Sequence, residues 1–330
     1  MVATLKHVAD RAGVSIRTVT RVLKDEPGTN PETYMRVRSV VDELGYIPNV
    51  AARNLKTSSI TMVGVVAPGN PKSEFITRKR AALQKRLENE GRYLLSGTLR
   101  ETEDQLRDML KEWIGLTRDV VFLAWPNEFS TARVLAGLPM HFVFVNCLDE
   151  RAYDHVLIDR AVGVYEGVQC LLRTGHRRIA HCGTNMRERR HGFEGAFDRP
   201  AGGQVVKLLI KTPHMDFEDG FAAGPRIMEQ QADAVFFDTD RMAYGFYHFA
   251  REQGVRIPDD ISVIGFDDEP GADYACPPLS SVSHPIAAIS EQVCEMIKQP
   301  AAATREVMLP TYFVRRESVR DGANSTKAKI

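Results

Sequence analysis

The residues of this 330-residue chain that could do chemistry are its histidines, its cysteines and some of its charged side chains. His176, His181 and His191 lie near one another, but no H-E-x-x-H motif or G-x-S-x-G elbow is present. No G-x-G-x-x-G or phosphate-binding loop follows any predicted strand. The sequence therefore predicts a protein that is not an enzyme and that uses no cofactor.

The five cysteines are odd in number and scattered, and none forms a C-x-x-C pair. This spacing argues against disulfides and against a zinc site, so no metal is expected. The prediction is that all five are buried, reduced and inert. They are Cys147, Cys170, Cys182, Cys276 and Cys294.

The charge totals hide a local imbalance. The chain has 43 Lys plus Arg against 43 Asp plus Glu, and 43% of its residues are hydrophobic, as in ordinary globular proteins of two or three domains. Residues 1–60 hold nine basic and six acidic side chains, so the remainder has an acidic excess of three. Neutrality therefore does not exclude nucleic acid. No apolar run approaches about 20 residues and the N-terminus lacks a signal-like apolar core, so we expect a cytoplasmic protein without membrane contact.

Elements that could position a binding surface are predicted first at the N-terminus. Residues 5–12 repeat apolar side chains with helical spacing, Gly13 ends that helix, and Ser15 can cap a second helix that runs to about Leu23. A third helix is predicted from about Pro31 to Leu44. Two helices joined by so tight a turn are typical of a helix-turn-helix.

The second predicted helix carries an outward face that suits DNA. Ile16, Arg17, Thr20 and Arg21 lie on outward rows, where arginine can form two hydrogen bonds to guanine and an aliphatic side chain can meet a thymine methyl. A solvated helix face is the alternative interpretation of the same pattern.

The runs TLKHVADRAGVSIRTVTRVLK and ELGYIPNVAARNLKT closely resemble the DNA-binding headpiece of the LacI/GalR family of bacterial transcription regulators. The resemblance implies that the second helix reads the major groove and that a hinge helix after Pro48 inserts Leu55 into the minor groove. Kinking by an apolar wedge is physically sound. The residues that the resemblance places at or near DNA are Thr4, Ser15, Ile16, Arg17, Thr18, Thr20, Arg21, Asn49, Ala52, Arg53, Leu55 and Lys56.

The predicted hinge helix, about 50–57, is shorter than the roughly 12 to 15 residues that an isolated helix needs in water. We therefore expect it to order only against DNA and a partner hinge, which makes it a switch. A plain flexible linker is the alternative.

From Ile60 onward, short β-branched or aromatic runs alternate with helical stretches, as in parallel sheets with helical crossovers. The clearest helices are predicted at 77–90, 102–115, 160–174 and 242–253. The stretches LLRTGHRRIAHCG, RERRHGFEGAF and GVRIPDDISVIGFDDEPGADYACPPLSSV resemble the LacI/GalR core, which is similar to periplasmic sugar-binding proteins. That resemblance implies a structural role for His176.

The predicted fold is thus an all-α helix-turn-helix headpiece with a hinge helix, followed by a periplasmic-binding-protein-like α/β core of two doubly wound lobes. The predicted domains are the headpiece at 1–48, the hinge and linker at 49–59, the core at 60–315 and a polar, fraying tail at 316–330. Within the core, lobe one is placed at about 60–160 plus 284–315, and lobe two at about 161–283.

The resemblance places an effector in the cleft between the lobes. Arg189, before Gly192 and Phe193, and Asp267, after the strand ISVIGF, match effector-contacting positions. Thr239 and Asn146 depart from the family pattern, as do residues 69–80. These departures leave open a sugar, a phosphorylated or acidic ligand, or no effector. The predicted effector residues are Arg189, Asp267, Asn146, Phe193, Thr239 and Asp240.

An aromatic wall is a further hypothesis about the cleft. Phe193, Phe217 and Phe221 could stack on a sugar ring, although such residues in an α/β lobe are more often core.

These observations together predict a repressor whose dimer binds a palindromic operator in double-stranded DNA under the control of a small-molecule effector, a sugar or sugar derivative. Dimers are favoured over tetramers because no leucine heptad follows the R-E-S motif at 316–318. The alternative is a ligand-independent DNA-binding dimer that uses the core only as a scaffold.

Overall fold

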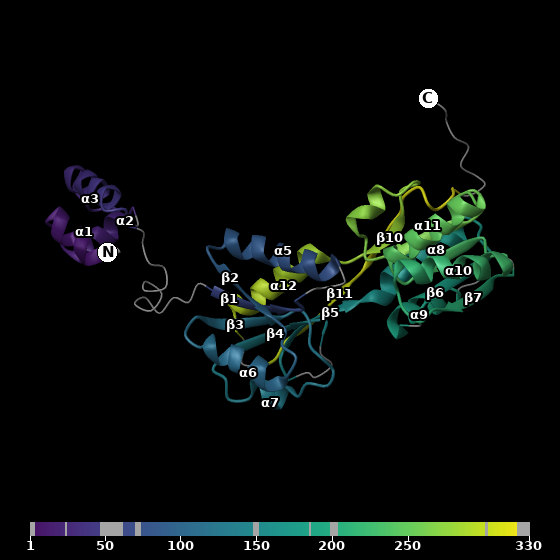
Figure 1. Cartoon of the computed structure of the whole chain (residues 1–330), viewed down its shortest axis with the longest axis horizontal. Helices are drawn as coiled ribbons and strands as arrows, with labels where there is room; N and C mark the ends of the chain where they lie inside the picture. The colour runs from purple at the N-terminus through teal and green to yellow at the C-terminus, as the bar shows by residue number, and fades with distance from the viewer. Residues whose placement is uncertain are drawn as a thin grey trace, which may run out of the picture. The chain divides into compact units, whose positions relative to one another are not determined.

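The computed structural model describes residues 4–23, 25–46, 62–69, 74–147, 152–184, 186–198, 204–300 and 303–321. The chain divides into two compact units, residues 1–61 and 62–330 (Figure 1). The predicted hinge lies outside the described residues.

In its described residues the first unit has the three predicted helices, α1 (Leu5–Ala12), α2 (Ile16–Leu23) and α3 (Pro31–Glu43). The Thr4 hydroxyl caps α1 by accepting from the His7 N–H, and Gly13 ends the helix at a left-handed φ of 64°. The helices enclose a small apolar core. Its buried members are Val8, Ala9, Ala12, Val19, Val22, Val37, Val40 and Tyr46.

The second unit contains two six-stranded sheets, each covered by helices on both faces (Figure 1). The first sheet, in lobe one, is parallel throughout and has the order β11-β5-β4-β3-β1-β2. Its strands are β1 (Met62–Ala67), β2 (Tyr93–Thr98), β3 (Thr117–Phe122), β4 (His141–Val145), β5 (Asp154–Asp159) and β11 (Glu306–Pro310). The helices α5 (Glu74–Asn89) and α12 (Ile286–Lys298) pack on one face, and α6 (Glu103–Glu112) and α7 (Thr131–Leu135) on the other.

The second sheet, in lobe two, has the order β12-β10-β9-β8-β6-β7, and only β12 is antiparallel to its neighbour. Its strands are β6 (Arg178–Gly183), β7 (Val206–Lys211), β8 (Ala234–Phe237), β9 (Ser262–Phe266), β10 (Ser280–Ser283) and β12 (Tyr312–Val314). The helices α8 (Arg160–Arg173) and α9 (Arg187–Gly195) cover one face, and α10 (Phe217–Glu229) and α11 (Asp240–Gln253) cover the other. A 3-10 helix, η1 (Pro270–Asp273), follows β9.

The chain crosses between the lobes three times, after β5, after β10 and after β11. The prediction that residues 284–315 return to lobe one is correct for α12 and β11, but β12 belongs to the second sheet. The predicted tail also begins too early. Ser318 is buried and donates to the Val263 carbonyl, and Val319 packs in the core of lobe two. Residues 316–321 are therefore held by tertiary contacts, although their polar sequence suggests a fraying tail.

Among the described helices, none is long and apolar enough to cross a membrane.

Candidate effector cavity and DNA-binding face

The exposed face of α2 carries the side chains predicted to read DNA. Ile16 is 42% exposed and Arg17 is exposed, while Thr20 and Arg21 are half-buried. The Ser15 hydroxyl accepts from the Thr18 N–H at 3.1 Å, which caps α2 and fixes its start. The helix is therefore held by its own cap and by the apolar core, while Ile16 and Arg17 of its outer face are exposed.

The two arginines of this face differ in their contacts. Arg21 Nη1 donates to the Gly28 carbonyl at 3.3 Å, so part of its guanidinium is engaged with the loop before α3. Arg17 projects from the first turn of α2, where it is exposed. Arg17 is thus the arginine better placed to meet a base edge.

The DNA-binding residues predicted in the hinge lie outside the described residues, and their roles stay predictions. They are Asn49, Ala52, Arg53, Leu55 and Lys56.

The second unit contains a cavity of about 890 Å³ that is lined from both lobes. Its walls are formed where parallel strands end: residues after β3, β4 and β5 in lobe one, and after β8, β9 and β10 in lobe two. Open α/β sheets place ligands at the carboxyl ends of their strands. The lining includes four of the six predicted effector residues, Asn146, Arg189, Thr239 and Asp267.

Arg189 is held in the cavity wall by a tight helix contact. A Cβ on Gly192, one turn later, would lie 2.3 Å from the carbonyl oxygen of Ala161, so the glycine allows α9 to approach α8 closely. Arg189 is 6% exposed, its guanidinium lies 3.9 Å above the Phe266 ring, and Nη1 donates to the Asp238 carbonyl. Its buried Nε has no hydrogen-bond partner among the described residues, and burial lowers the pKa of Arg189.

Asp267 turns into the cavity directly after β9. Its backbone has a left-handed φ of 101°, and its carboxylate accepts from His284 Nε2 at 3.0 Å. Burial lowers the pKa of His284 to about 4 despite the opposing bond to Asp267, so the ring is neutral at pH 7 and Nε2 carries its hydrogen. His284 also stacks on Phe75 of α5 at 3.6 Å between ring centroids, which joins the two lobes.

Asn146 and Thr239 have polar groups that are already engaged in the fold. Asn146 has a left-handed φ of 52°, and its Oδ1 accepts from the Ile158 N–H at 3.0 Å, so the group left for a ligand is the amide Nδ2, a hydrogen-bond donor. The Thr239 hydroxyl donates to the Met215 carbonyl at 3.0 Å and accepts from the Met242 N–H as the cap of α11.

Two predicted effector residues do not reach the cavity. Phe193 is fully buried in the core of lobe two, where it packs against His181 and Phe197. Asp240 is also fully buried, and it accepts from the Glu269 N–H at 2.7 Å and from the Ser281 hydroxyl at 2.6 Å. Asp240 therefore secures the loop after β9 and is not a ligand group.

The proposed aromatic wall is wrong for the other two phenylalanines as well. Phe217 is 39% exposed, Phe221 packs against the core of lobe two, and neither lines the cavity. The aromatic side chains that do line it are Phe75, Trp125 and Phe129 of lobe one.

Lys79 is one of the cavity residues that the sequence prediction missed. It lies on α5 within a run of basic residues that resembles a solvated face, yet it is only 4% exposed. A signal was available, because Phe75, Lys79, Leu83 and Leu87 repeat at intervals of four and all four are buried. Burial lowers the pKa of Lys79 to about 8, and its Nζ lies 4.4 Å from the centroid of the Phe75 ring.

The lobes are also joined at the cavity by Arg78, which neighbours Lys79 on α5. Its Nη1 donates to the backbone carbonyls of Asp267, at 3.2 Å, and Asp268. Asp268 in turn accepts from Arg316 Nη2 at 2.8 Å. A ligand that contacts both α5 and the loop after β9 will therefore change the forces that hold the lobes together.

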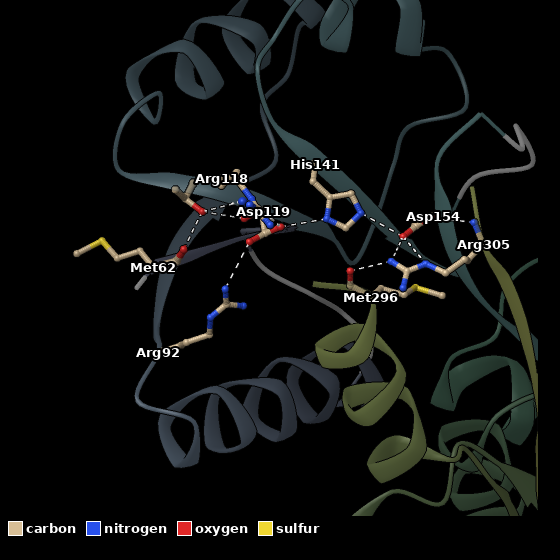
Figure 2. A network of polar contacts seen from close by, with 9 residues as sticks. Met62, Arg92, Arg118, Asp119, His141, Asp154, Met296 and Arg305 are labelled. Atoms are coloured by element: carbon tan, nitrogen blue, oxygen red, sulfur yellow. Dashed lines mark hydrogen bonds and ion pairs between the residues drawn. The ribbon is translucent and has the colours of Figure 1, made fainter. Parts of the chain in front are cut away.

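A second cluster of charges lies at the opposite ends of the same strands in lobe one (Figure 2). His141 stands between two buried carboxylates, with Nδ1 3.0 Å from Asp119 and Nε2 3.1 Å from Asp154. Arg305 donates to Asp154 and to the Met296 carbonyl. We call Asp119, His141, Asp154 and Arg305 the His141 cluster.

The charges of the His141 cluster stabilise one another. Burial opposes the charge on His141, but its hydrogen bonds to Asp119 and Asp154 outweigh burial and raise its pKa. Burial alone would raise the pKa of Asp154, but the hydrogen bonds from Arg305 outweigh burial and lower this pKa. Both nitrogens of His141 and both carboxylates have partners, so this cluster offers little to a ligand.

Of the five cysteines, Cys147 lines the cavity and the other four do not, and His176 is buried away from it. All five cysteines are described and are free thiols, and Cys276 is exposed, contrary to the prediction that all are buried. His176 is buried against Ser262 and the Leu171 carbonyl, which is a structural position. Among the described residues, no group of three or more His, Cys, Asp or Glu is arranged to hold a metal ion.

Known proteins resemble both units. Residues 4–49 match the family of bacterial regulatory proteins called lacI, and residues 168–319 match a periplasmic binding protein-like domain. The HTH-type transcriptional regulator GalS of Salmonella typhimurium is 30% identical over 332 residues, which cover 96% of each protein.

Two solved structures share the fold of nearly the whole chain. The lac repressor dimer bound to operator and the anti-inducer ONPF has a TM-score of 0.78 and 22% identity, and the match covers 96% of this chain and 99% of that one. The complex of the regulator CelR with cellobiose has a TM-score of 0.64 and 26% identity, with the same coverage.

A helix-turn-helix unit followed by a two-lobed binding fold defines a class of DNA-binding transcription regulators, and the relatives are regulators, not enzymes. The fold class, the function class and the non-enzymatic character predicted from the sequence are thereby confirmed. With 30% identity over nearly its whole length, this chain belongs to the LacI family of bacterial transcription regulators.

Proposed function

We propose that this chain is a repressor whose dimer binds a palindromic operator, and that a sugar or sugar-derived effector in the cavity between the lobes controls this binding. The observation that carries the proposal is the cavity itself, which is lined from both lobes at the carboxyl ends of their strands. Effector binding that favours one lobe arrangement shifts the population that is competent for DNA. Because the proposed target is operator DNA, we propose that the protein acts in the cytoplasm and is bound to the nucleoid when it occupies its operator.

The proposed effector residues are Asn146, Arg189, Thr239 and Asp267, which line the cavity; Phe193 and Asp240 do not line it. The proposed DNA contacts are Ile16, Arg17, Thr20 and Arg21 on α2, with Thr4, Ser15 and Thr18 near the backbone and the five hinge residues after Pro48. The dimer is supported by the lac repressor, which binds its operator as a dimer, and the sugar by the complex of CelR with cellobiose.

The experiment is selection of operator sequences from a random DNA pool with the full chain, followed by affinity measurements on the selected DNA. We expect an inverted repeat, bound by a dimer. Sugars, sugar acids and sugar phosphates are then added to the operator complex, and at least one is expected to change its affinity. If none does, and if Arg189→Ala leaves regulation intact, the core is only a dimerisation scaffold.

The base-reading role of α2 has its own test. Arg17→Ala is expected to reduce discrimination between operator and random DNA by about 1–3 kcal/mol per lost base contact. Arg36→Ala, which removes an exposed arginine from α3, is the matched control for charge and should lower both affinities together or leave both unchanged. Equal losses on operator and random DNA for Arg17→Ala would contradict base reading.

A further inference from the structure

The cavity contains more cationic groups than its own carboxylates can pair. Its lining includes the cations Lys79, Arg160 and Arg189 and the carboxylates Glu188 and Asp267. Glu188 pairs with Arg160 at 2.7 Å. Asp267 accepts a hydrogen bond from the neutral His284 at 3.0 Å, so its negative charge still acts on Arg189. Within the described part of the chain, Lys79 is therefore the cation left without a side-chain carboxylate, whereas Arg189 has Asp267 nearby but forms no ion pair with it.

Lys79 is the more unusual of these two groups. A protonated amine on a side chain that is only 4% exposed, with no carboxylate partner among the described residues, carries an uncompensated desolvation cost. The ring of Phe75, whose centroid lies 4.4 Å from Nζ, offsets only part of that cost. The amine also keeps its charge at neutral pH, because burial lowers its pKa only to about 8.

The other groups around Lys79 do not compensate its charge. The charged and titratable groups that act on it are Cys147 and Arg160. Burial raises the pKa of the Cys147 thiol to about 12, so that group is neutral, and Arg160 is itself a cation. His284, which stacks on the same Phe75 ring, is uncharged at pH 7.

Two further groups of the lining, on Asn146 and Arg189, present hydrogen-bond donors that need an acceptor from a ligand. Asn146 is an amide with its oxygen already bonded, so it presents N–H donors from Nδ2. Arg189 is anchored through Nη1, while its buried Nε lacks an acceptor. An unpartnered buried donor is costly in the empty site and becomes favourable when a ligand supplies an acceptor.

We propose that the effector is an anion, a sugar-sized polyhydroxylated molecule with a carboxylate or phosphate group, and that Lys79 binds its charged group with Arg189 as the second cation. This inference rests on the proposed function of the cavity as the effector site, and it narrows the effector class from sugars in general to acidic ones. Lys79 belongs to lobe one and Arg189 to lobe two, so an anion held by both favours the closed arrangement of the lobes.

The test uses the full chain, without DNA, and matched neutral and anionic probes. Glucose, glucuronate and glucose 6-phosphate form one set, and galactose, galacturonate and galactose 6-phosphate form another. Inorganic phosphate is tested alone. Binding at millimolar concentration is followed by calorimetry and by the shift in Tm, for the native chain, for Lys79→Met and for Lys85→Met. Lys85 is exposed on the same helix and is the matched control.

The expected result is that at least one anionic sugar binds more tightly than its neutral counterpart and that Lys79→Met weakens this binding by more than about tenfold, with no change in Lys85→Met. The carboxylate and phosphate members of each set distinguish the two sources of charge. The proposal is overturned if a neutral sugar binds as tightly as its anionic partners, if no anion binds, or if Lys79→Met retains the anion. Lys79→Arg separates charge from packing, and it should keep part of the affinity.

The same probes distinguish this inference from the proposed function. Anion binding that depends on Lys79 but leaves operator affinity unchanged would support the inference and contradict the regulatory role of the cavity. An effect on operator affinity by a neutral sugar alone would support the regulatory role and overturn the inference.

Discussion

The two ends of the first sheet carry charged clusters of opposite character. At the amino ends of β3, β4 and β5, the His141 cluster pairs each carboxylate with a cation (Figure 2). At the carboxyl ends of the same strands, Lys79 is buried and charged without a carboxylate partner in the described chain. Both clusters are polar and buried, so burial alone does not identify a site. The difference lies in whether the partners are supplied by the fold or must come from a ligand.

This comparison predicts opposite effects on stability when a charge is removed. The largest effect is expected for Asp154→Ala, which leaves His141 and Arg305 without their shared acceptor. Breaking a buried ion pair on one side costs about 3–5 kcal/mol of unfolding free energy. Denaturant titration measures this loss, and Asp108→Ala, which removes an exposed partner of Lys111, should change stability by less than about 1 kcal/mol. A loss for Asp154→Ala as small as that of the control would contradict a structural role.

Lys79→Met is expected to have the opposite sign. The side chain keeps its length and apolar contacts and loses a buried charge, so the unfolding free energy should rise by about 1–3 kcal/mol in the absence of ligand. Thermal denaturation of the ligand-free chain measures the change. A lower Tm would mean that the protein itself satisfies the Lys79 amine, and the two clusters would then no longer differ.

A smaller effect is expected from pH. Because the pKa of His141 is raised in the folded state, its contribution to stability is complete below the unfolded value of 6.5 and is lost as pH rises through the folded pKa. The stability difference between the native chain and His141→Gln should therefore shrink from pH 6 towards alkaline pH. Lys79 and the other titratable groups are present in both proteins, so their contributions to the pH dependence of stability cancel in the difference. A difference that grows with pH would show that His141 is held neutral.

Much of the architecture could be predicted from the sequence because local patterns determine it. Capping by Thr4, the break at Gly13 and the alternation of strands and helices follow from short-range chemistry, and the motif resemblance supplies the two-lobed topology. The assignment of β12 and Ser318 to lobe two could not be predicted, because it depends on contacts between residues far apart in the chain.

The candidate site was less accessible to prediction than the fold. Arg189 and Asp267 were found because they follow motif positions, but Phe193 and Asp240, which stand in similar motifs, face the core of lobe two. Lys79 was missed because a basic residue among basic neighbours suggests solvent exposure. Only its position in the stripe with Phe75, Leu83 and Leu87 indicates burial. The type of a residue predicts the chemistry of its side chain, whereas the tertiary structure determines whether that side chain has a partner.

The most direct test of the central claim is the uptake of protons when an anionic sugar binds. At pH near 8 the folded chain holds Lys79 partly deprotonated, and an anion beside Nζ raises its pKa. Calorimetry in buffers of different ionisation enthalpy measures the protons taken up. The account predicts net uptake by the native chain near pH 8, weaker anion binding above that pH, and loss of this uptake in Lys79→Met. Equal proton uptake by the native chain and Lys79→Met would contradict it.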